Sequence, residues 1–162
     1  MSRPELYYWI SNTKPNCSAF ENNECPNCHY ISNTEDVFCE KCGKLLPKPT
    51  VQKDGEYRLI KGFVSTYKRM SNDEPAPTIT TRSAYACSDK NVHPTQNRVL
   101  SLYEVALLFG INPDDYNWKI KRDGKEVYAN SMLLRDISGE PVTPVYTKML
   151  GEQLKKIEEQ YL

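Results

Sequence analysis

The sequence predicts an α+β protein, in which a small mixed β-rich domain carries an inserted zinc ribbon and a C-terminal helix. Three observations support this fold class. Two Cys-x-x-Cys pairs lie within residues 25–42, a β-prone run occupies residues 78–81, and apolar residues recur at helical spacing over residues 146–161. The chain has 162 residues, which is enough for one hydrophobic core or for two small ones.

Residues 1–24 are predicted to form an N-terminal segment. Its aromatic patch at residues 6–10 is rich in residues that favour strands, so we expect a short strand there. Residues 11–16 combine Ser, Asn and Pro, which is typical of a turn.

Residues 25–46 are predicted to form the zinc ribbon. Each Cys-x-x-Cys makes a tight knuckle whose two thiolates point at one centre, and the ten residues between the pairs allow a hairpin. Four thiolates at about 2.3 Å from one ion in a tetrahedron make a closed structural Zn²⁺ site. Such an ion stabilises a ribbon that is too small to hold itself together. The predicted ligands are Cys25, Cys28, Cys39 and Cys42.

Two residues beside the cysteines receive separate interpretations. Gly43 follows the last cysteine and supplies the unusual backbone angle that a knuckle needs. His29 adjoins Cys28 and cannot easily reach the same ion, so it is interpreted as a bystander. A redox-active cysteine pair is the alternative to the metal site, and two pairs in one small polar ribbon argue against it.

The middle of the chain is basic although the whole is neutral. Lysine plus arginine and aspartate plus glutamate number 21 each, but residues 58–98 hold seven cations against three anions. This distribution fits a nucleic-acid footprint. Residues 47–57 are expected to be a linker and turn, and residues 58–67 a strand that leads into the β-prone run at 78–81.

Short hydroxyl groups among cations suit contacts with phosphates and base edges of double-stranded DNA. Two prolines stiffen the approach to the run at residues 78–81, and cations lie on both sides of it. A solvated β-hairpin is the alternative interpretation of this stretch. The candidates for DNA contact are Lys68, Arg69, Thr78, Ile79, Thr80, Thr81 and Arg82.

The last third of the chain predicts two helices and a hairpin. Ser101 and Glu104 form a capping box that opens a helix, and Gly110 ends it. Asp123-Gly124 predicts a hairpin tip. Pro144 is expected at the first position of the last helix, where apolar residues spaced by three and four define one face. That face could pack on its own core or dock on another protein.

The sequence holds no apolar run near 18 residues and no signal-peptide pattern at its start. We therefore expect a soluble, cytoplasmic protein with no membrane partner. The metal-type spacing of four of the six cysteines fits a reducing compartment better than a disulfide framework does.

Three blocks of sequence follow one another at plausible spacing: Pro-Thr-Ile-Thr-Thr at 77–81, residues 93–116 with Phe-Gly at 109–110 and Pro-Asp-Asp-Tyr at 113–116, and residues 137–144. Together they resemble the C-terminal part of DNA (cytosine-5) methyltransferases, over roughly residues 58–160. In that family the target recognition domain is followed by two motif blocks and a final helix that returns to the catalytic domain.

The resemblance implies a role for each block. Thr78 and Ile79 match the pair of the recognition domain that lies against DNA beside the flipped cytosine. Arg98 matches the arginine that helps to hold the recognition domain in place, and Glu104 is assigned to the same orienting role. Residues 47–130 would then be the recognition domain with its following helix, and residues 131–162 a block and helix that dock on a catalytic partner. The edge of the S-adenosylmethionine pocket would be formed by Gly139, Glu140 and Val142.

The departures from the family pattern are as informative as the matching blocks. No cysteine follows a proline, no Glu-Asn-Val block occurs, and no Gly-x-Gly occurs among the seven glycines. Cytosine methylation needs a thiolate nucleophile and a methyl donor. Tyr103 and Leu107 stand where the family has arginines, and Glu140 stands where it has asparagine.

These features predict a non-catalytic subunit. The chain is interpreted as the DNA target recognition subunit of a two-chain cytosine-5 methyltransferase of a restriction-modification system. It would form a heterodimer with a catalytic chain that binds S-adenosylmethionine. Two alternatives remain open: a free-standing zinc-ribbon protein that binds DNA or regulates a methyltransferase, and an adaptor that binds proteins without DNA.

Overall fold

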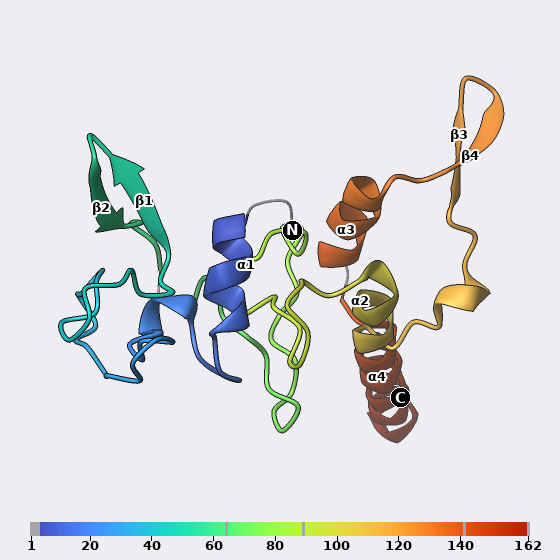
Figure 1. Ribbon diagram of the computed structural model, residues 1–162. Helices are drawn as coiled ribbons and strands as arrows, with labels where there is room; N and C mark the ends of the chain where they lie inside the picture. Colours follow the sequence, from blue (N-terminus) through green and yellow to red (C-terminus); the bar gives the residue numbers. More distant parts are fainter. Residues whose placement is uncertain (1–3, 64, 89, 141, 162) are drawn as a thin grey trace. The chain divides into compact units, whose positions relative to one another are not determined.

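The computed structural model describes residues 4–63, 65–88, 90–140 and 142–161, and it confirms the α+β class (Figure 1). The chain divides into two compact units. Unit 1 comprises Met1–Pro77 and Tyr85–Val99, and unit 2 comprises Thr78–Ala84 and Leu100–Leu162. The short segment Thr78–Ala84 therefore belongs with the C-terminal helices. The four ranges derived from the sequence stay a prediction.

Helix α1, Pro4–Ser11, opens unit 1, and the strand expected at residues 6–10 was wrong. Leu6, Trp9 and Ile10 are spaced by three and one, so a helix places them on one face, and this packing overrides the strand preference of aromatic residues. A short 3₁₀ helix, η1 at Ala19–Glu21, follows the turn.

The core of unit 1 is small and is made by residues far apart in sequence. Ile10 packs with Ala86 and Val92, and Leu6, Tyr67 and Val99 lie against this cluster. The rings of Trp9 and Tyr67 meet edge to face at 5.7 Å. The loop 85–99 is thereby fixed onto α1.

Strands β1, Thr50–Lys53, and β2, Glu56–Leu59, form an antiparallel hairpin in unit 1. Asp54 and Gly55 both have positive φ, at 54° and 85°, as a two-residue primed turn requires. The sequence predicted a turn here, but the predicted strand at residues 58–67 corresponds to β2 only in its first two residues.

Unit 2 contains the predicted capped helix, α2 at Leu102–Leu108. The amide of Glu104 donates to the Ser101 hydroxyl at 3.2 Å, and the amide of Ser101 donates to the Glu104 carboxylate at 2.7 Å, which confirms the capping box. A 3₁₀ turn, η2 at Pro113–Asp115, follows. Helix α3, Ser131–Gly139, packs against α2 and is capped by the Asn130 side chain.

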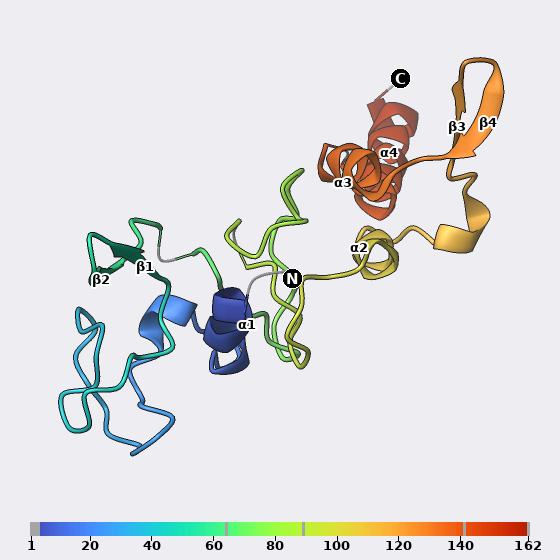
Figure 2. The ribbon, with the colours of Figure 1, turned by 45° about the horizontal axis from the view of Figure 1, so that its top comes forward.

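The second hairpin lies between η2 and α3. Strands β3, Lys119–Arg122, and β4, Lys125–Tyr128, pair antiparallel around Asp123 and Gly124, as predicted. Both turn residues have positive φ, at 50° and 76°. In both views the two strands form a long, narrow ribbon (Figures 1 and 2).

Helix α4, Pro144–Tyr161, ends the described chain and begins at the predicted proline. None of its described residues is buried. In the part of the chain that the structure describes, no helix combines the length and the apolar character needed to span a membrane.

Candidate metal centre and nucleic-acid interface

The four predicted cysteine ligands converge on one point in unit 1. Their Sγ atoms all lie within 4.8 Å of one another. The Sγ atoms of Cys25 and Cys42 are 3.6 Å apart, and those of Cys28 and Cys39 are 3.5 Å apart. A tetrahedron with metal–sulfur bonds of about 2.3 Å has edges of about 3.8 Å. The cluster therefore has the size and the donor set for one thiolate-bound metal ion.

The first Cys-x-x-Cys turn is closed by two backbone hydrogen bonds. The amide of Cys25 donates to the carbonyl of Tyr30, and the amide of His29 donates to the carbonyl of Cys25, both at 2.9 Å. An isolated bridge between Glu24 and Ile31 continues this turn. The backbone alone thus aims the first two thiols inward.

The second turn repeats the pattern at the same offsets. The amide of Cys39 donates to the carbonyl of Lys44, and the amide of Gly43 donates to the carbonyl of Cys39, both at 2.8 Å. Gly43 has φ of 69°, and His29 has φ of 56° at the equivalent position of the first turn. His29 is therefore the left-handed residue of its knuckle, a role that its matching offset from Cys25 could have indicated.

The thiols differ in their readiness to ionise. Burial opposes ionisation of Cys39, but the backbone amides of Cys42 and Lys41 stabilise its thiolate and lower its pKa to about 6. The amide of Tyr30 favours the Cys28 thiolate, but burial and the neighbouring sulfurs outweigh it and raise the pKa of Cys28 to about 12. A bound cation relieves this crowding of negative charge.

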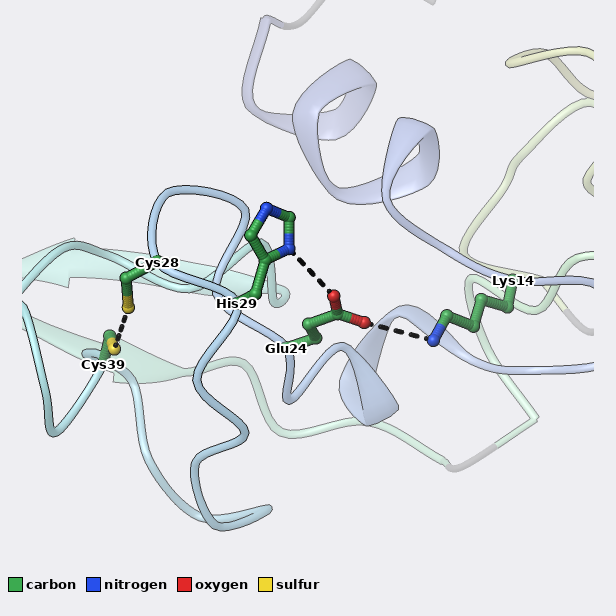
Figure 3. A network of polar contacts seen from close by, with 5 residues as sticks. All are labelled: Lys14, Glu24, Cys28, His29 and Cys39. Atoms are coloured by element: carbon green, nitrogen blue, oxygen red, sulfur yellow. Dashed lines mark hydrogen bonds and ion pairs between the residues drawn. The ribbon is translucent and has the colours of Figure 1, made fainter.

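An exposed ionic network flanks the cluster (Figure 3). The Glu24 carboxylate lies 3.1 Å from Nδ1 of His29 and 3.2 Å from Nζ of Lys14. Hydrogen bonds from His29 and then Lys14 hold the pKa of the Glu24 carboxyl below its usual value. The network links the first knuckle to the segment after α1. Because its side chains are exposed, we assign it little stabilising energy.

Lys48 fixes the loop between the two knuckles. Its side chain is fully buried, and its ammonium donates to the carbonyls of Asn33, Thr34 and Asp36, each at 2.9 Å. Burial lowers the pKa of the Lys48 ammonium, and nearby carboxylates partly offset this lowering. A buried ammonium needs such partners, because it loses its hydration on folding.

We expect Lys48→Met to lower the free energy of unfolding of unit 1 by about 3 kcal/mol, because three carbonyls lose a charged donor. Lys44→Met is the matched control. The Lys44 ammonium is exposed and, among the residues that the structure describes, donates to the Asn27 side chain alone, so the change should stay within about 0.5 kcal/mol. Urea unfolding followed by Trp9 fluorescence, in a shared Trp118→Phe background, measures both. Equal effects of the two variants would contradict the assignment of Lys48.

Arg69, a candidate for DNA contact, lies inside unit 1. Arg69 is 4% exposed, and burial lowers the pKa of its guanidinium. It ties the end of α1 to the loop 93–97, so its donors are used within the protein and we leave it out of the proposed DNA interface. Its five acceptors, at 2.6–2.8 Å, are the carbonyls of Ile10, Thr13, His93 and Gln96 and the side-chain oxygen of Asn97.

The other candidates for DNA contact fall in both units. Lys68 is half-buried in unit 1, while residues 78–82 lie in unit 2. Ile79 is buried, whereas Thr78 and Arg82 are exposed and Thr80 and Thr81 are half-buried. The β-prone run forms no strand and instead turns at residues 80–83, where the Ser83 amide donates to the Thr80 carbonyl.

Helix α3 holds the segment Thr78–Ala84 in place. The buried Arg135 donates to the carbonyl and hydroxyl of Ser83, at 3.0 and 3.3 Å, and to the Leu100 carbonyl at 2.7 Å. Gly139 approaches the same segment so closely that a Cβ there would overlap the Thr81 amide nitrogen. The structure thus joins the predicted recognition run to the C-terminal block, a contact between sites that the sequence treated separately.

The remaining predicted site residues have local roles. Arg98 donates to the Gln96 side chain and the Val99 carbonyl, and Glu104 caps α2. Glu140 ends α3 and is exposed, as is Val142. Pro141, between them, lies outside the described residues.

Comparison with known proteins gives one informative match. No family model matches the chain. The chain is 38% identical over 104 residues to the type II methyltransferase M1.HgaI of Avibacterium volantium. The match covers 59% of this chain and 27% of that protein, so the chain spans about a quarter of the length of the curated relative it matches. The chain is therefore related to a type II methyltransferase.

Proposed function

We propose that this chain is the DNA target recognition subunit of a two-chain cytosine-5 DNA methyltransferase. A separate catalytic chain supplies the nucleophilic cysteine and binds S-adenosylmethionine. This chain supplies the recognition segment, a zinc-loaded ribbon and a closing helix. The similarity to a type II methyltransferase supports a methyltransferase-associated role.

The uncovered helix α4 carries the proposal. An 18-residue helix with a continuous apolar stripe buries that stripe in a folded assembly, because exposed apolar area is costly. At the start of α4, Val145 lies beside Gly110 at the end of α2. A catalytic chain would cover the rest of the stripe. Its exposed members are Val145, Tyr146, Met149, Leu150, Leu154, Ile157 and Tyr161.

The DNA contacts of the proposed subunit come from cations and hydroxyls that remain accessible. Lys68 would contact phosphates, and Thr78 and Arg82 would reach base edges, with Thr80 and Thr81 beside them. Ile79 is buried and would instead fix the segment from below. Arg135 and Gly139 act as positioning residues, because they hold this segment on α3.

Leu150→Asp is expected to abolish assembly with the catalytic chain while leaving unit 2 folded, because Leu150 is about half exposed and a charge on the stripe would be desolvated in the interface. Lys148→Asp is the control on the opposite face of α4, and it should leave assembly unchanged. Size-exclusion chromatography with light scattering measures assembly, and transfer of labelled methyl groups measures activity. Assembly by both variants alike would refute α4 as the docking helix.

A further inference from the structure

The β3–β4 hairpin carries cations on both of its faces. Opposite residues of an antiparallel pair share a face, and neighbours along a strand alternate. The register pairs Lys119 with Tyr128 and Lys121 with Glu126, so two lysines lie on one face. Arg122 pairs with Lys125, and these two lie together on the other face.

Most of these cations are available to a partner. Lys119 lies 4.0 Å from Glu126 and 5.6 Å from the centre of the Tyr128 ring, so it is engaged within the hairpin. Within the described residues, Lys121, Arg122 and Lys125 form no ion pair, and all three are exposed. Residues 119–128 hold four cations against two anions, Asp123 and Glu126, so the hairpin keeps an excess of two positive charges.

The hairpin is also shaped in advance. Asp123 and Gly124 close it with the positive φ angles of a two-residue turn. At its base the Trp118 indole donates to the Pro113 carbonyl at 2.6 Å, and the Ala129 amide donates to the Trp118 carbonyl at 2.9 Å. An isolated two-stranded ribbon is only marginally stable, so these anchors keep it formed in solvent.

We propose that the β3–β4 hairpin is a second DNA-contacting element, a ribbon that enters the major groove of duplex DNA. The inference rests on the proposed function and adds a contact that residues 68–82 do not supply. A major groove about 12 Å wide admits a two-stranded ribbon and has phosphates along both walls. Cations on both faces meet both walls, which a one-sided basic patch cannot do.

The β1–β2 hairpin provides an internal control. It has the same strand length and the same Asp-Gly turn, but its cations Lys53 and Arg58 are balanced by Asp54 and Glu56. Removing two cations from either hairpin changes the net charge of the protein equally. A difference in DNA binding between the two double variants is therefore due to where the cations lie and not to the net charge.

The test measures binding of the full chain to fluorescein-labelled fragments of sheared genomic duplex DNA at several salt concentrations, alone and with its catalytic chain. For Lys121→Ser/Arg122→Ser, the slope of log affinity against log salt should become shallower by about 2 units, since each lost phosphate contact removes about 0.9. Lys53→Ser/Arg58→Ser should leave the slope unchanged. A photo-crosslinking p-benzoylphenylalanine should capture DNA from position 127 but not from position 51, where the native valines are similarly exposed.

The outcomes separate the two levels of the proposal. Binding by the unchanged chain, with equal slopes for all variants and no crosslink at position 127, overturns the ribbon and leaves the recognition subunit standing. An equal loss of slope in both double variants also overturns the proposed role of the β3–β4 hairpin, because it would show that only the net charge of the protein affects DNA binding. No DNA binding by the unchanged chain, alone or with its catalytic chain, overturns both.

Discussion

Cys39→Ser is expected to abolish stoichiometric zinc binding and to unfold the ribbon at residues 25–46. A structural zinc site contributes about 10–16 kcal/mol of apparent binding free energy, and this free energy is also folding free energy. The buried apolar cluster of the ribbon is small, with Leu46 beside the cysteines, and its polar contacts include isolated bridges and the buried Lys48. Loss of one of four ligands therefore removes the largest single contribution to its stability.

Cys87→Ser is the matched control, since Cys87 is exposed and lies outside the cluster. The metal content of both purified variants can be measured by mass spectrometry, and ribbon order by hydrogen exchange at the amides of residues 25–46. A Cys39→Ser protein that retains one zinc per chain with full amide protection would contradict the four-thiolate site. Loss of protection on chelation of the unchanged protein is expected in parallel.

Gly139→Ala is expected to displace the segment Thr78–Ala84 from α3. The added Cβ would overlap the Thr81 amide nitrogen and would lie 2.5 Å from the Thr80 carbonyl carbon. Both atoms belong to the backbone, so no side-chain rotation relieves the overlap. Overpacking of this kind lowers the free energy of unfolding by about 1–3 kcal/mol. We expect a value at the upper end of this range because the backbone itself must move. If the proposed function holds, a shift of about 1 Å in the segment Thr78–Ala84 should also lower methyl transfer by the proposed two-chain enzyme about 100-fold.

Gly151→Ala is the control for this change. Gly151 also lies in a helix, α4, but no heavy atom would meet its Cβ within 4 Å. Alanine should therefore stabilise α4 by about 1 kcal/mol, through helix propensity alone. Thermal unfolding and methyl transfer measured for both variants give the comparison. A stable and fully active Gly139→Ala protein would show that the close contact with Thr81 does not matter.

The features that the sequence predicted well depend on neighbouring residues. The capping box of α2 needs only Ser101 and Glu104, and the β3–β4 turn needs only Asp123 and Gly124. The convergence of the four cysteines follows from two identical local turns. Asp54-Gly55 carries the same local turn signal, and the sequence predicted a linker and turn over residues 47–57, but it did not predict the strands β1 and β2 on both sides of that turn.

The features that the sequence did not predict depend on contacts between distant segments. Arg69, Arg135 and Lys48 resemble surface cations in the sequence, yet each is buried among backbone carbonyls that only the fold brings near. The presence of a lysine or arginine in a sequence does not reveal whether its side chain donates to DNA phosphates or to backbone carbonyls of the same protein. The β propensity of residues 78–81 predicted a β-like run, but the structure has a turn at residues 80–83 that packs closely against Gly139.

The most direct test of the account is reconstitution of methyl transfer. The chain and the catalytic chain that co-purifies with it are prepared separately, then assayed alone and mixed with cytosine-containing duplex DNA and labelled S-adenosylmethionine. The account predicts transfer to cytosine C5 only in the mixture, and loss of that transfer with Leu150→Asp. Methyl transfer by this chain alone, or undiminished transfer by the catalytic chain without it, would contradict its assignment as the recognition subunit.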